Sequence, residues 1–493
     1  MALEETTIAL RDPGLAPERG FIDGEWCGAD SGGTFAVTNP ATGEVLANVP
    51  RMGAAETRRA IEAAQRAQEE WSRRPAAERA AILRRLHDLM IDHQEDLALL
   101  LTLEQGKPLA ESRAEIAYAA SFCEWFGEEA KRVYGDTIPS PQRDKRILVT
   151  KHPIGVCGGI TPWNFPSAMV TRKAAPALAV GCTMVLKPAE QTPLSALAIA
   201  ELAHRAGLPG GVLSIVTGDA DDAPAIGAEL TSNPVVRKVG FTGSNQVGKL
   251  IMRQCSDQVK NVSLELGGNA PFIVFEDADM EQAVAGALLC KFRNSGQTCI
   301  TANRMLVHES RHREFLEGLR AAVEGLVVGD GTDPGSTVGP LIDQPAFDKV
   351  THHVADAVDR GSRLLMGGQP HERGRTFYSP TVLDGLADDC AIWHEETFGP
   401  VAAVRPFGSE REAIELANDT PYGLAAYMYS RDVARIFRVS EQLETGILGI
   451  NTGFISVEVA PFGGVKESGI GREGSKYGVE DWIETRYLSL GGI

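Results

Sequence analysis

The sequence predicts an α/β fold built from two units, each with a mainly parallel sheet. From about residue 154, short apolar runs alternate with helical stretches, which is the pattern of parallel strands covered by helices. A second series of the same kind follows residue 268. The chain of 493 residues is also too long for one core, because single cores stop growing near about 250–300 residues.

The amino-terminal part is predicted to be helical. Residues 52–71 and 76–103 each place apolar side chains at helical spacing. The second range reads as one long helix that ends at Gly106-Lys107-Pro108, since glycine and proline terminate helices.

The alternating part defines the predicted strands. In the first unit they are 154–160, 183–186, 213–216 and 238–241, with helices at 194–206 and 246–255. In the second unit they are 271–275, 305–307, 402–406 and 446–451. We expect the two units to meet near Gly267-Gly268. The segments 144–152 and 485–490 alternate like edge strands, and we expect them to pair with each other or with another subunit.

Composition excludes several classes of function. The formal net charge is −18, which disfavours nucleic acid as a partner because phosphate backbones are bound by clustered Lys and Arg. The eight cysteines form no C-x-x-C pair, so neither a metal site nor a disulfide scaffold is expected. The longest apolar run, 174–186, has thirteen residues, whereas a membrane span needs about 20. We therefore read it as buried core and, with no signal-like start, expect a cytoplasmic protein with no membrane partner.

Two glycine-rich motifs need their context. Gly469–Gly474 fits G-x-G-x-x-G but lacks the strand before it and the helix after it that a dinucleotide fingerprint requires, so we interpret it as a loop. Gly243–Lys249 nearly fits a phosphate-binding P-loop, but Leu250 stands where a hydroxyl is needed. A strand still turns into a helix at Ser244, and such a turn presents backbone N–H groups to an anion. This predicts contact with a nucleotide phosphate, with a plain strand–helix connection as the alternative.

Three polar residues are candidates for chemistry. Cys299 lies in a polar, glycine-containing turn, where a thiol is more accessible than in an apolar core. Glu265 is a single carboxylate in an apolar strand, so it is either a buried general base or a strand residue that faces water. Asn164 precedes an aromatic–proline turn and is either an oxyanion donor or a turn former.

Seven short motifs follow one another along the chain. They are Pro162–Pro166, Lys187–Glu190, Phe241–Ser244, Leu264–Gly268, Gly296–Cys299, Glu395–Pro400 and Pro461–Gly469. In this order and spacing they resemble the aldehyde dehydrogenase superfamily, over nearly the whole chain. The resemblance implies an NAD-dependent enzyme in which Cys299 is the nucleophile and Glu265 activates water. Asn164 and the backbone N–H of Cys299 would form the oxyanion hole.

The resemblance also assigns a cofactor site and a domain organisation. The implied cofactor-binding residues are Trp163, Lys187, Glu190, Gly243, Ser244, Glu396 and Phe398. It implies a Rossmann-like NAD-binding domain (1–137 and 155–268), an α/β catalytic domain (269–475) and a small β oligomerisation element (138–154 and 476–493), with assembly as a homodimer or homotetramer. NAD is favoured over NADP because the carboxylate of Glu190 would accept a hydrogen bond from the ribose 2′-hydroxyl and repel a 2′-phosphate. The alternative stays open because Lys187 lies nearby.

Within the superfamily the sequence is most similar to succinate-semialdehyde dehydrogenases, and glutarate-semialdehyde dehydrogenases are also similar. The similar stretches are Ser167–Lys173, Lys291–Asn294, Ala302–Arg304, Phe454–Ser456 and Gly469–Asp481. The similarity implies that Arg172, Arg293 and Ser456 hold the distal carboxylate of the substrate, which is a role suited to arginine. Succinate and glutarate semialdehyde both remain candidates.

Two other functions compete with this reading. A CoA-acylating dehydrogenase would use Cys299 in the same way but would pass the thioester to a thiol, and Glu265 as a base argues against it. A non-catalytic structural or binding protein would not need the intact set of Cys299, Glu265 and Asn164.

Overall fold

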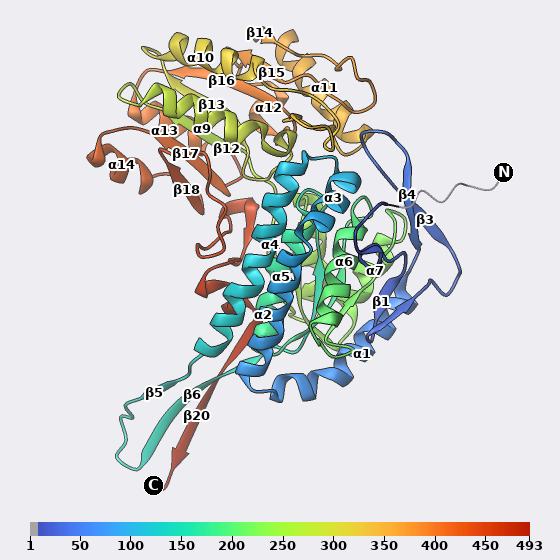
Figure 1. The fold of residues 1–493 in the computed structure, drawn as a ribbon. Helices are drawn as coiled ribbons and strands as arrows, with labels where there is room; N and C mark the ends of the chain where they lie inside the picture. Colours follow the sequence, from blue (N-terminus) through green and yellow to red (C-terminus); the bar gives the residue numbers. More distant parts are fainter. Residues whose placement is uncertain (1–7) are drawn as a thin grey trace, which may run out of the picture.

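The computed structural model describes residues 8–493, whose strands form two large sheets and a projecting arm (Figure 1). The first sheet has eight strands in the order β19-β11-β10-β7-β8-β9-β1-β2. They are β1 (Gly20–Ile22), β2 (Glu25–Cys27), β7 (Val156–Ile160), β8 (Thr183–Lys187), β9 (Leu213–Ile215), β10 (Val236–Thr242), β11 (Asn261–Glu265) and β19 (Gly469–Ile470). The strands β7 to β11 pair in parallel, and β1, β2 and β19 add antiparallel pairs. The predicted α/β unit is therefore confirmed.

Eight helices precede or accompany this sheet. They are α1 (Ala54–Arg73), α2 (Ala76–Asp92), α3 (Gln94–Gln105), α4 (Leu109–Glu129), α5 (Pro166–Val180), α6 (Pro193–Arg205), α7 (Ala223–Ser232) and α8 (Asn245–Ser256). The single helix predicted over 76–103 is wrong, because the chain leaves the helical conformation at His93. Apolar spacing could not locate this break, since α2 and α3 both bury apolar faces on either side of it.

The second sheet has seven strands in the order β14-β15-β16-β13-β12-β17-β18. They are β12 (Ala270–Val274), β13 (Ala302–His308), β14 (Arg363–Met366), β15 (Thr381–Asp384), β16 (Val401–Phe407), β17 (Ala425–Tyr429) and β18 (Ile447–Ile450). The accompanying helices are α9 (Met280–Phe292), α10 (His312–Glu324), α11 (Gln344–Asp359), α12 (Ala391–His394), α13 (Glu410–Asn418) and α14 (Val433–Ser440). All pairs in this sheet are parallel except β14 with β15. The second predicted unit is also confirmed.

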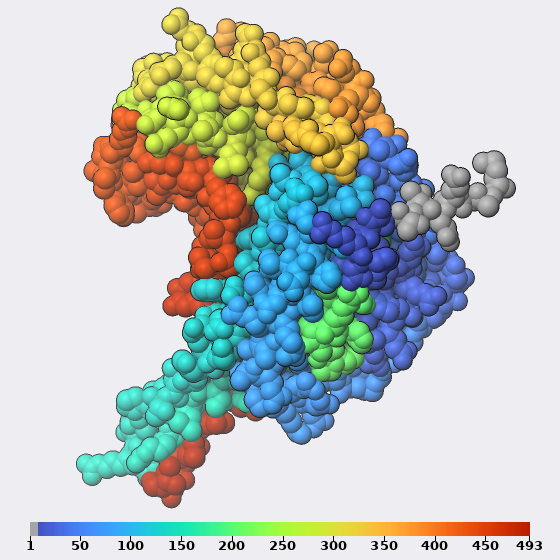
Figure 2. Space-filling model, in the orientation of Figure 1, coloured from blue at the N-terminus to red at the C-terminus, as the bar shows by residue number. Residues whose placement is uncertain are grey.

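The arm is a three-stranded antiparallel sheet that extends away from the body of the molecule and carries the carboxyl terminus (Figures 1 and 2). It consists of β5 (Asp136–Ile138), β6 (Lys145–Pro153) and β20 (Ile483–Gly491). β20 pairs with β6 along its whole length, so the two predicted edge strands pair with each other.

Smaller elements complete the fold. β3 (Thr34–Thr38) and β4 (Val45–Pro50) form a separate hairpin, and short 3-10 turns lie at Pro13–Leu15, Ala130–Arg132, Arg293–Gly296, Lys466–Ser468 and Lys476–Trp482. The segment Gly469–Gly474, which was expected to be a loop, starts with the two residues of β19. The apolar run 174–186 is divided between α5 and β8 and is buried throughout, as expected. Within residues 8–493, no helix is both long and apolar enough to cross a bilayer.

The two large sheets meet at the predicted glycines. β11 ends at Glu265 and β12 begins at Ala270, which pairs with Ala302 of β13. A side-chain carbon on Gly268 would lie 2.3 Å from the carbonyl oxygen of Cys299. Only glycine permits this approach, and it brings the start of β13 against the end of the first sheet.

Candidate active site

The carboxyl ends of four neighbouring strands are level with one another in the first sheet. Lys187 of β8 pairs with Ile160 of β7, and Ile160 pairs with Phe241 of β10. One residue further along β10, Thr242 pairs with Glu265 of β11. Ligands of open α/β sheets bind outside the carboxyl ends of the strands, so the register makes this edge the candidate cofactor-binding site.

Lys187 and Glu190 lie together on this edge. The Nζ of Lys187 donates to the carbonyl of Pro188 at 3.1 Å and lies 3.5 Å from Oε2 of Glu190. The lysine side chain is 5% exposed and that of Glu190 is 30% exposed. Burial lowers the pKa of Lys187. Glu190 is thus the solvent-accessible acceptor of the pair, which is suited to a ribose hydroxyl.

The turn after β10 has the predicted strand–helix geometry. Ser244 is the N-cap of α8, and its Oγ accepts a hydrogen bond from the N–H of Val247 at 3.4 Å. Gly243 separates it from the last residue of the strand. Remaining N–H groups of the first helical turn are available to an anion, so this position fits a cofactor pyrophosphate.

Residues from both sheets meet at the other end of this edge. Oε1 of Glu396 accepts a hydrogen bond from the N–H of Gly268 at 3.1 Å, and burial raises the pKa of this carboxyl to about 7. Phe398, with a φ of 57°, places its ring 5.5 Å from that of Trp163 in an edge-to-face contact. Beyond the start of α8, Glu396 thus offers a second carboxylate suited to a ribose, and Phe398 and Trp163 offer an aromatic pair. The predicted cofactor residues fit a dinucleotide.

Cys299 lies in the loop between α9 and β13. Two residues of this loop, Asn294 and Ser295, have φ values of 50° and 55°, which forces a tight reversal before the thiol. Burial, followed by the charge of Glu396, raises the pKa of Cys299 to about 12, and the charge of Arg172 opposes this shift. The thiol therefore needs a proton acceptor before it can act as a nucleophile.

Glu265 and Asn164 are both buried, at 4% exposure each. Oε2 of Glu265 has no hydrogen-bond partner among the described residues. Burial, followed by the charge of Glu473, raises the pKa of Glu265 well above its usual range. The alternative of a strand residue facing water is thereby excluded.

The amide of Asn164 reaches the cysteine loop. Its Nδ2 donates to the carbonyl of Gln297 at 3.0 Å, two residues before Cys299. A side-chain amide has two N–H groups, so one is left for another acceptor near the thiol.

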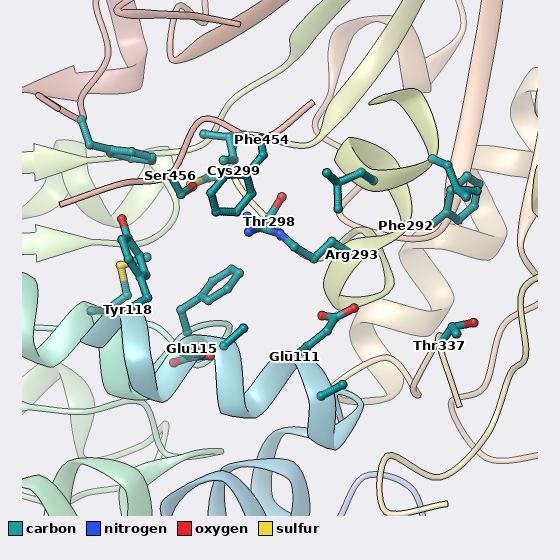
Figure 3. Close-up of a pocket in the computed structure, with 18 of the residues that line it drawn as sticks. Glu111, Glu115, Tyr118, Phe292, Arg293, Thr298, Cys299, Thr337, Phe454 and Ser456 are labelled. Carbon is teal, nitrogen blue, oxygen red and sulfur yellow. The ribbon is translucent and has the colours of Figure 1, made fainter. Parts of the chain in front are cut away.

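A cavity of about 560 Å³ opens beside the thiol (Figure 3). It is mainly apolar and contains Cys299 together with all three predicted substrate-binding residues, Arg172, Arg293 and Ser456. Apolar side chains from α4, α5, α9 and the 454–462 segment form most of its wall; they include Ala110, Ala114, Phe165, Met169, Leu288, Leu289, Phe292, Phe454 and Phe462. Asn164 and Glu265 are not part of this wall.

The two arginines of the cavity differ in their environments. Arg172 is 2% exposed, and its Nη2 lies 2.9 Å from Oε2 of Glu473. Arg293 lies between the rings of Phe165 and Phe454, at 5.4 and 5.5 Å from the ring centres. In the part of the chain that the structure describes, it forms no ion pair within 4.0 Å. Burial raises the pKa of the nearby Glu111, and the charge of Arg293 is one of those that oppose this shift. Arg293 is therefore the arginine whose charge is available to a ligand, while that of Arg172 is already matched.

Several residues around the site were not predicted from the sequence. Glu111, Glu115 and Tyr118 of α4 line the cavity, Lys107 contacts the Asn164 loop, and Glu473 pairs with Arg172. Glu111 and Glu115 are four residues apart in the helical segment 109–129. This spacing could have indicated a shared role, because it places both carboxylates on one helix face.

Comparison with known proteins bears on this arrangement. The model described as "Aldehyde dehydrogenase family" matches residues 26–488. The chain belongs to the aldehyde dehydrogenase family. It is an NAD(P)-dependent oxidoreductase with the fold of that family.

Relatives of this aldehyde dehydrogenase match over essentially their full length. The glutarate-semialdehyde dehydrogenase of Pseudomonas aeruginosa is 60% identical, covering 99% of this chain and 100% of its own. The NADP(+) succinate-semialdehyde dehydrogenase of Escherichia coli is 59% identical, covering 98% and 100%. The crystal structure of succinate-semialdehyde dehydrogenase from Burkholderia pseudomallei is 59% identical and superimposes with a TM-score of 0.97, again covering 98% and 100%. The family and fold inferred from the seven motifs are confirmed.

Proposed function

We propose that this aldehyde dehydrogenase oxidises a short semialdehyde that ends in a carboxylate, namely succinate semialdehyde to succinate, with glutarate semialdehyde as the alternative. The observation that carries the proposal is Arg293, whose charge has no ion-pair partner in the described chain and which lines the same cavity as Cys299. A guanidinium binds a carboxylate through two parallel hydrogen bonds. The names of the relatives from Pseudomonas aeruginosa and Escherichia coli support both substrates.

Cys299 is the proposed nucleophile. Its sulfur, once deprotonated, adds to the aldehyde carbon and forms a thiohemiacetal. The Asn164 amide and the backbone N–H of Cys299 stabilise the negative oxygen, because donors fixed in advance favour the charge that develops in the transition state. When bound, oxidised NAD(P) would supply the acceptor for the hydride that leaves the thiohemiacetal carbon. The acyl group then remains on Cys299 as a thioester.

Glu265 is the proposed base for the second half of the reaction. It removes a proton from a water molecule that attacks the thioester and releases the carboxylic acid. Its raised pKa makes a carboxyl group a stronger base at the cost of a smaller ionised fraction near neutral pH. A base in this position favours hydrolysis over transfer of the acyl group to CoA.

Cofactor binding is assigned to the strand ends and to the Glu396–Phe398 segment. Lys187 and Glu190 hold the adenosine ribose, Ser244 lies by the pyrophosphate, and Glu396 holds the nicotinamide ribose. The partly exposed carboxylate of Glu190 favours NAD, since it accepts from a 2′-hydroxyl and repels a 2′-phosphate. NADP is the alternative.

The arm is the proposed contact between subunits in a homodimer or homotetramer. It exposes large apolar side chains that include Ile138 at 45%, Tyr487 at 62% and Leu490 at 41%. Exposed apolar groups on a projecting sheet favour burial against another chain. Analytical ultracentrifugation of the intact chain measures its oligomeric state. A monomer at micromolar concentration would contradict this part of the proposal.

Initial-rate kinetics test the function directly. The substrates are succinate semialdehyde, glutarate semialdehyde and an uncharged aldehyde of similar length, each with NAD and with NADP. We expect the highest kcat/KM for a semialdehyde, and free acid as product with or without CoA. Equal efficiency with the uncharged aldehyde would contradict the arginine-based specificity, and accumulation of an acyl-CoA would contradict the role of Glu265.

A further inference from the structure

A buried ammonium group lies between the Asn164 loop and α4. Nζ of Lys107 donates to Oε2 of Glu115 at 2.6 Å and to the backbone carbonyl of Asn164 at 2.7 Å. It also lies 4.0 Å from the ring centre of Phe165. The side chains of Lys107 and Glu115 are each 1% exposed. Two hydrogen bonds and one cation–π contact therefore connect the lysine to α4 and to the Asn164–Phe165 turn.

Such a pair needs an explanation other than stability. Removing two charges from water costs several kcal/mol per ion, and replacing a buried ion pair by apolar residues is often neutral or stabilising. Burial lowers the pKa of Lys107, although the charge of Glu115 opposes this. The contacts of the pair indicate what it does.

The second oxygen of Glu115 fixes the start of α5. Oε1 accepts hydrogen bonds from the N–H groups of Ser167 and Ala168 at 3.0 and 3.3 Å. α5 has no side-chain cap of its own, and a carboxylate at a helix N-terminus satisfies free N–H groups and complements the helix dipole. Glu115 thus binds the start of α5 directly and the carbonyl of Asn164 through Lys107.

Glu111, one turn earlier on α4, holds the cysteine loop. Its Oε2 accepts from the backbone N–H of Asn294 at 2.7 Å. The side chain of Asn294 donates to the carbonyls of Asn164 at 3.0 Å and Gln297 at 3.2 Å. Figure 3 shows Glu111 and Glu115 leaving the same helix below Arg293 and Cys299. The loops of Asn164 and Cys299 are therefore both attached to one face of α4.

We propose that Lys107, Glu115 and Glu111 form a positioning unit that sets the place of the Asn164 amide relative to Cys299. None of the three is assigned a chemical step; they act through Asn164, so the inference rests on the proposed role of that residue. Oxyanion stabilisation depends on donors that are already in place, and a displacement of about 1 Å can lower a rate about 100-fold.

The test is the rate of the first NADH burst at saturating cofactor and semialdehyde. The double variant K107M/E115Q removes both charges and keeps an acceptor for the N–H groups of α5. We expect its burst rate constant to fall about 100-fold, with the Kd for NADH and the melting temperature nearly unchanged. Glu104→Gln is the matched control, because Glu104 is a buried carboxylate that accepts from the first N–H groups of α6 in the same way. We expect this control to retain the wild-type burst.

A mutant cycle with Asn164→Ala separates positioning from general structure. If the unit acts through Asn164, K107M/E115Q has no further effect in the Asn164→Ala background, because the two changes remove the same interaction. Additive losses, or an unchanged burst in K107M/E115Q alone, would overturn the proposal. If Asn164→Ala alone leaves the burst unchanged, the oxyanion assignment itself fails.

Glu111 provides a second route if K107M/E115Q does not fold. Glu111→Ala removes the acceptor for the N–H of Asn294, and Glu111→Gln retains one. We expect the burst to slow about 10-fold in the alanine variant, since a lost hydrogen bond to a charged group costs about 1.5 kcal/mol or more, and to recover in the glutamine variant. Equal bursts in both variants would overturn the positioning role.

Discussion

The proposed cofactor site and the substrate cavity are built in different ways. The cofactor site lies at the carboxyl ends of the parallel strands β7, β8, β10 and β11, which we call the cofactor edge, so sheet register places Lys187, Ser244 and Glu265. The substrate cavity is formed by side chains from α4, α5, α9 and the 454–462 segment. The residues of the cofactor edge lie at the ends of strands that the sequence pattern predicts. The lining of the cavity depends instead on how the helices pack against one another, which the pattern does not predict.

This difference shows in the charges of the two regions. At the carboxyl ends of β7, β8, β10 and β11, Glu190 remains partly exposed beside Lys187 and can contact a ligand directly. In the cavity, Arg172 is paired with Glu473, whereas Arg293 forms no ion pair within 4.0 Å with a described carboxylate, and Glu111 is the carboxyl group that its charge affects. Two arginines that look equivalent in the sequence are therefore expected to do different work.

The largest expected effect is at the point where the two regions meet. Cys299→Ala should lower NAD(P)H formation by at least about 10⁴-fold, because removing a covalent nucleophile disables the whole catalytic set. Cofactor binding, measured by fluorescence, should persist. Cys27→Ala is the control, since Cys27 is similarly half-buried but lies in β2. Retained turnover in Cys299→Ala would rule out the thiol mechanism.

Glu265→Gln should separate the two halves of the reaction. We expect steady-state turnover to fall about 10²- to 10⁴-fold, the usual contribution of a general base, while one equivalent of NADH still forms in a burst. Because the pKa of Glu265 is raised by burial, the carboxylate fraction increases with pH. Wild-type deacylation should therefore accelerate as pH rises, and this dependence should disappear in the glutamine variant. Loss of the burst itself would assign Glu265 to the earlier step instead.

Single replacements of the arginines test the asymmetry of the cavity. Arg293→Met should lower kcat/KM for succinate semialdehyde about 10- to 100-fold, since hydrogen bonds to charged groups contribute about 1.5–3 kcal/mol, and should spare uncharged aldehydes. Arg172→Met should lower activity with both kinds of aldehyde, because it leaves Glu473 with Lys173 alone near the active site. The measurement is kcat/KM for succinate semialdehyde and for an uncharged aldehyde in each of the two variants. Identical substrate profiles would show that the arginines are equivalent.

The smallest expected effect is on the cofactor edge. Glu190→Ser should raise the NADP/NAD ratio of kcat/KM by about 2- to 5-fold, because interactions of partly exposed charges are worth about 1 kcal/mol or less. The shift should shrink at high salt, where exposed charges are screened. An unchanged ratio at low salt would remove Glu190 from cofactor selection.

The sequence predicted most of the fold because its strands are short apolar runs with clear ends. Strands β7 to β11 of the first sheet, β12, β13, β16 and β18 of the second, the glycine junction and the two long arm strands follow from local pattern. The remaining strands of the two sheets (β1, β2, β14, β15, β17 and β19) were not predicted, and the sequence left the partner of each arm strand open. The break at His93 was missed, since apolar spacing continues on both sides of it. The domain limits and the roles of the site residues stay predictions.

The sequence by itself determined the family, and it named the candidate reactive residues and the sheet edge proposed for the cofactor, because these follow from motif order and strand ends. Only the tertiary structure decided which arginine is available, since Glu473 lies 301 residues from Arg172 in the chain yet 2.9 Å away in space. It also decided that Lys107 supports Asn164. Burial and pairing are properties of packing between distant segments, and no local pattern records them.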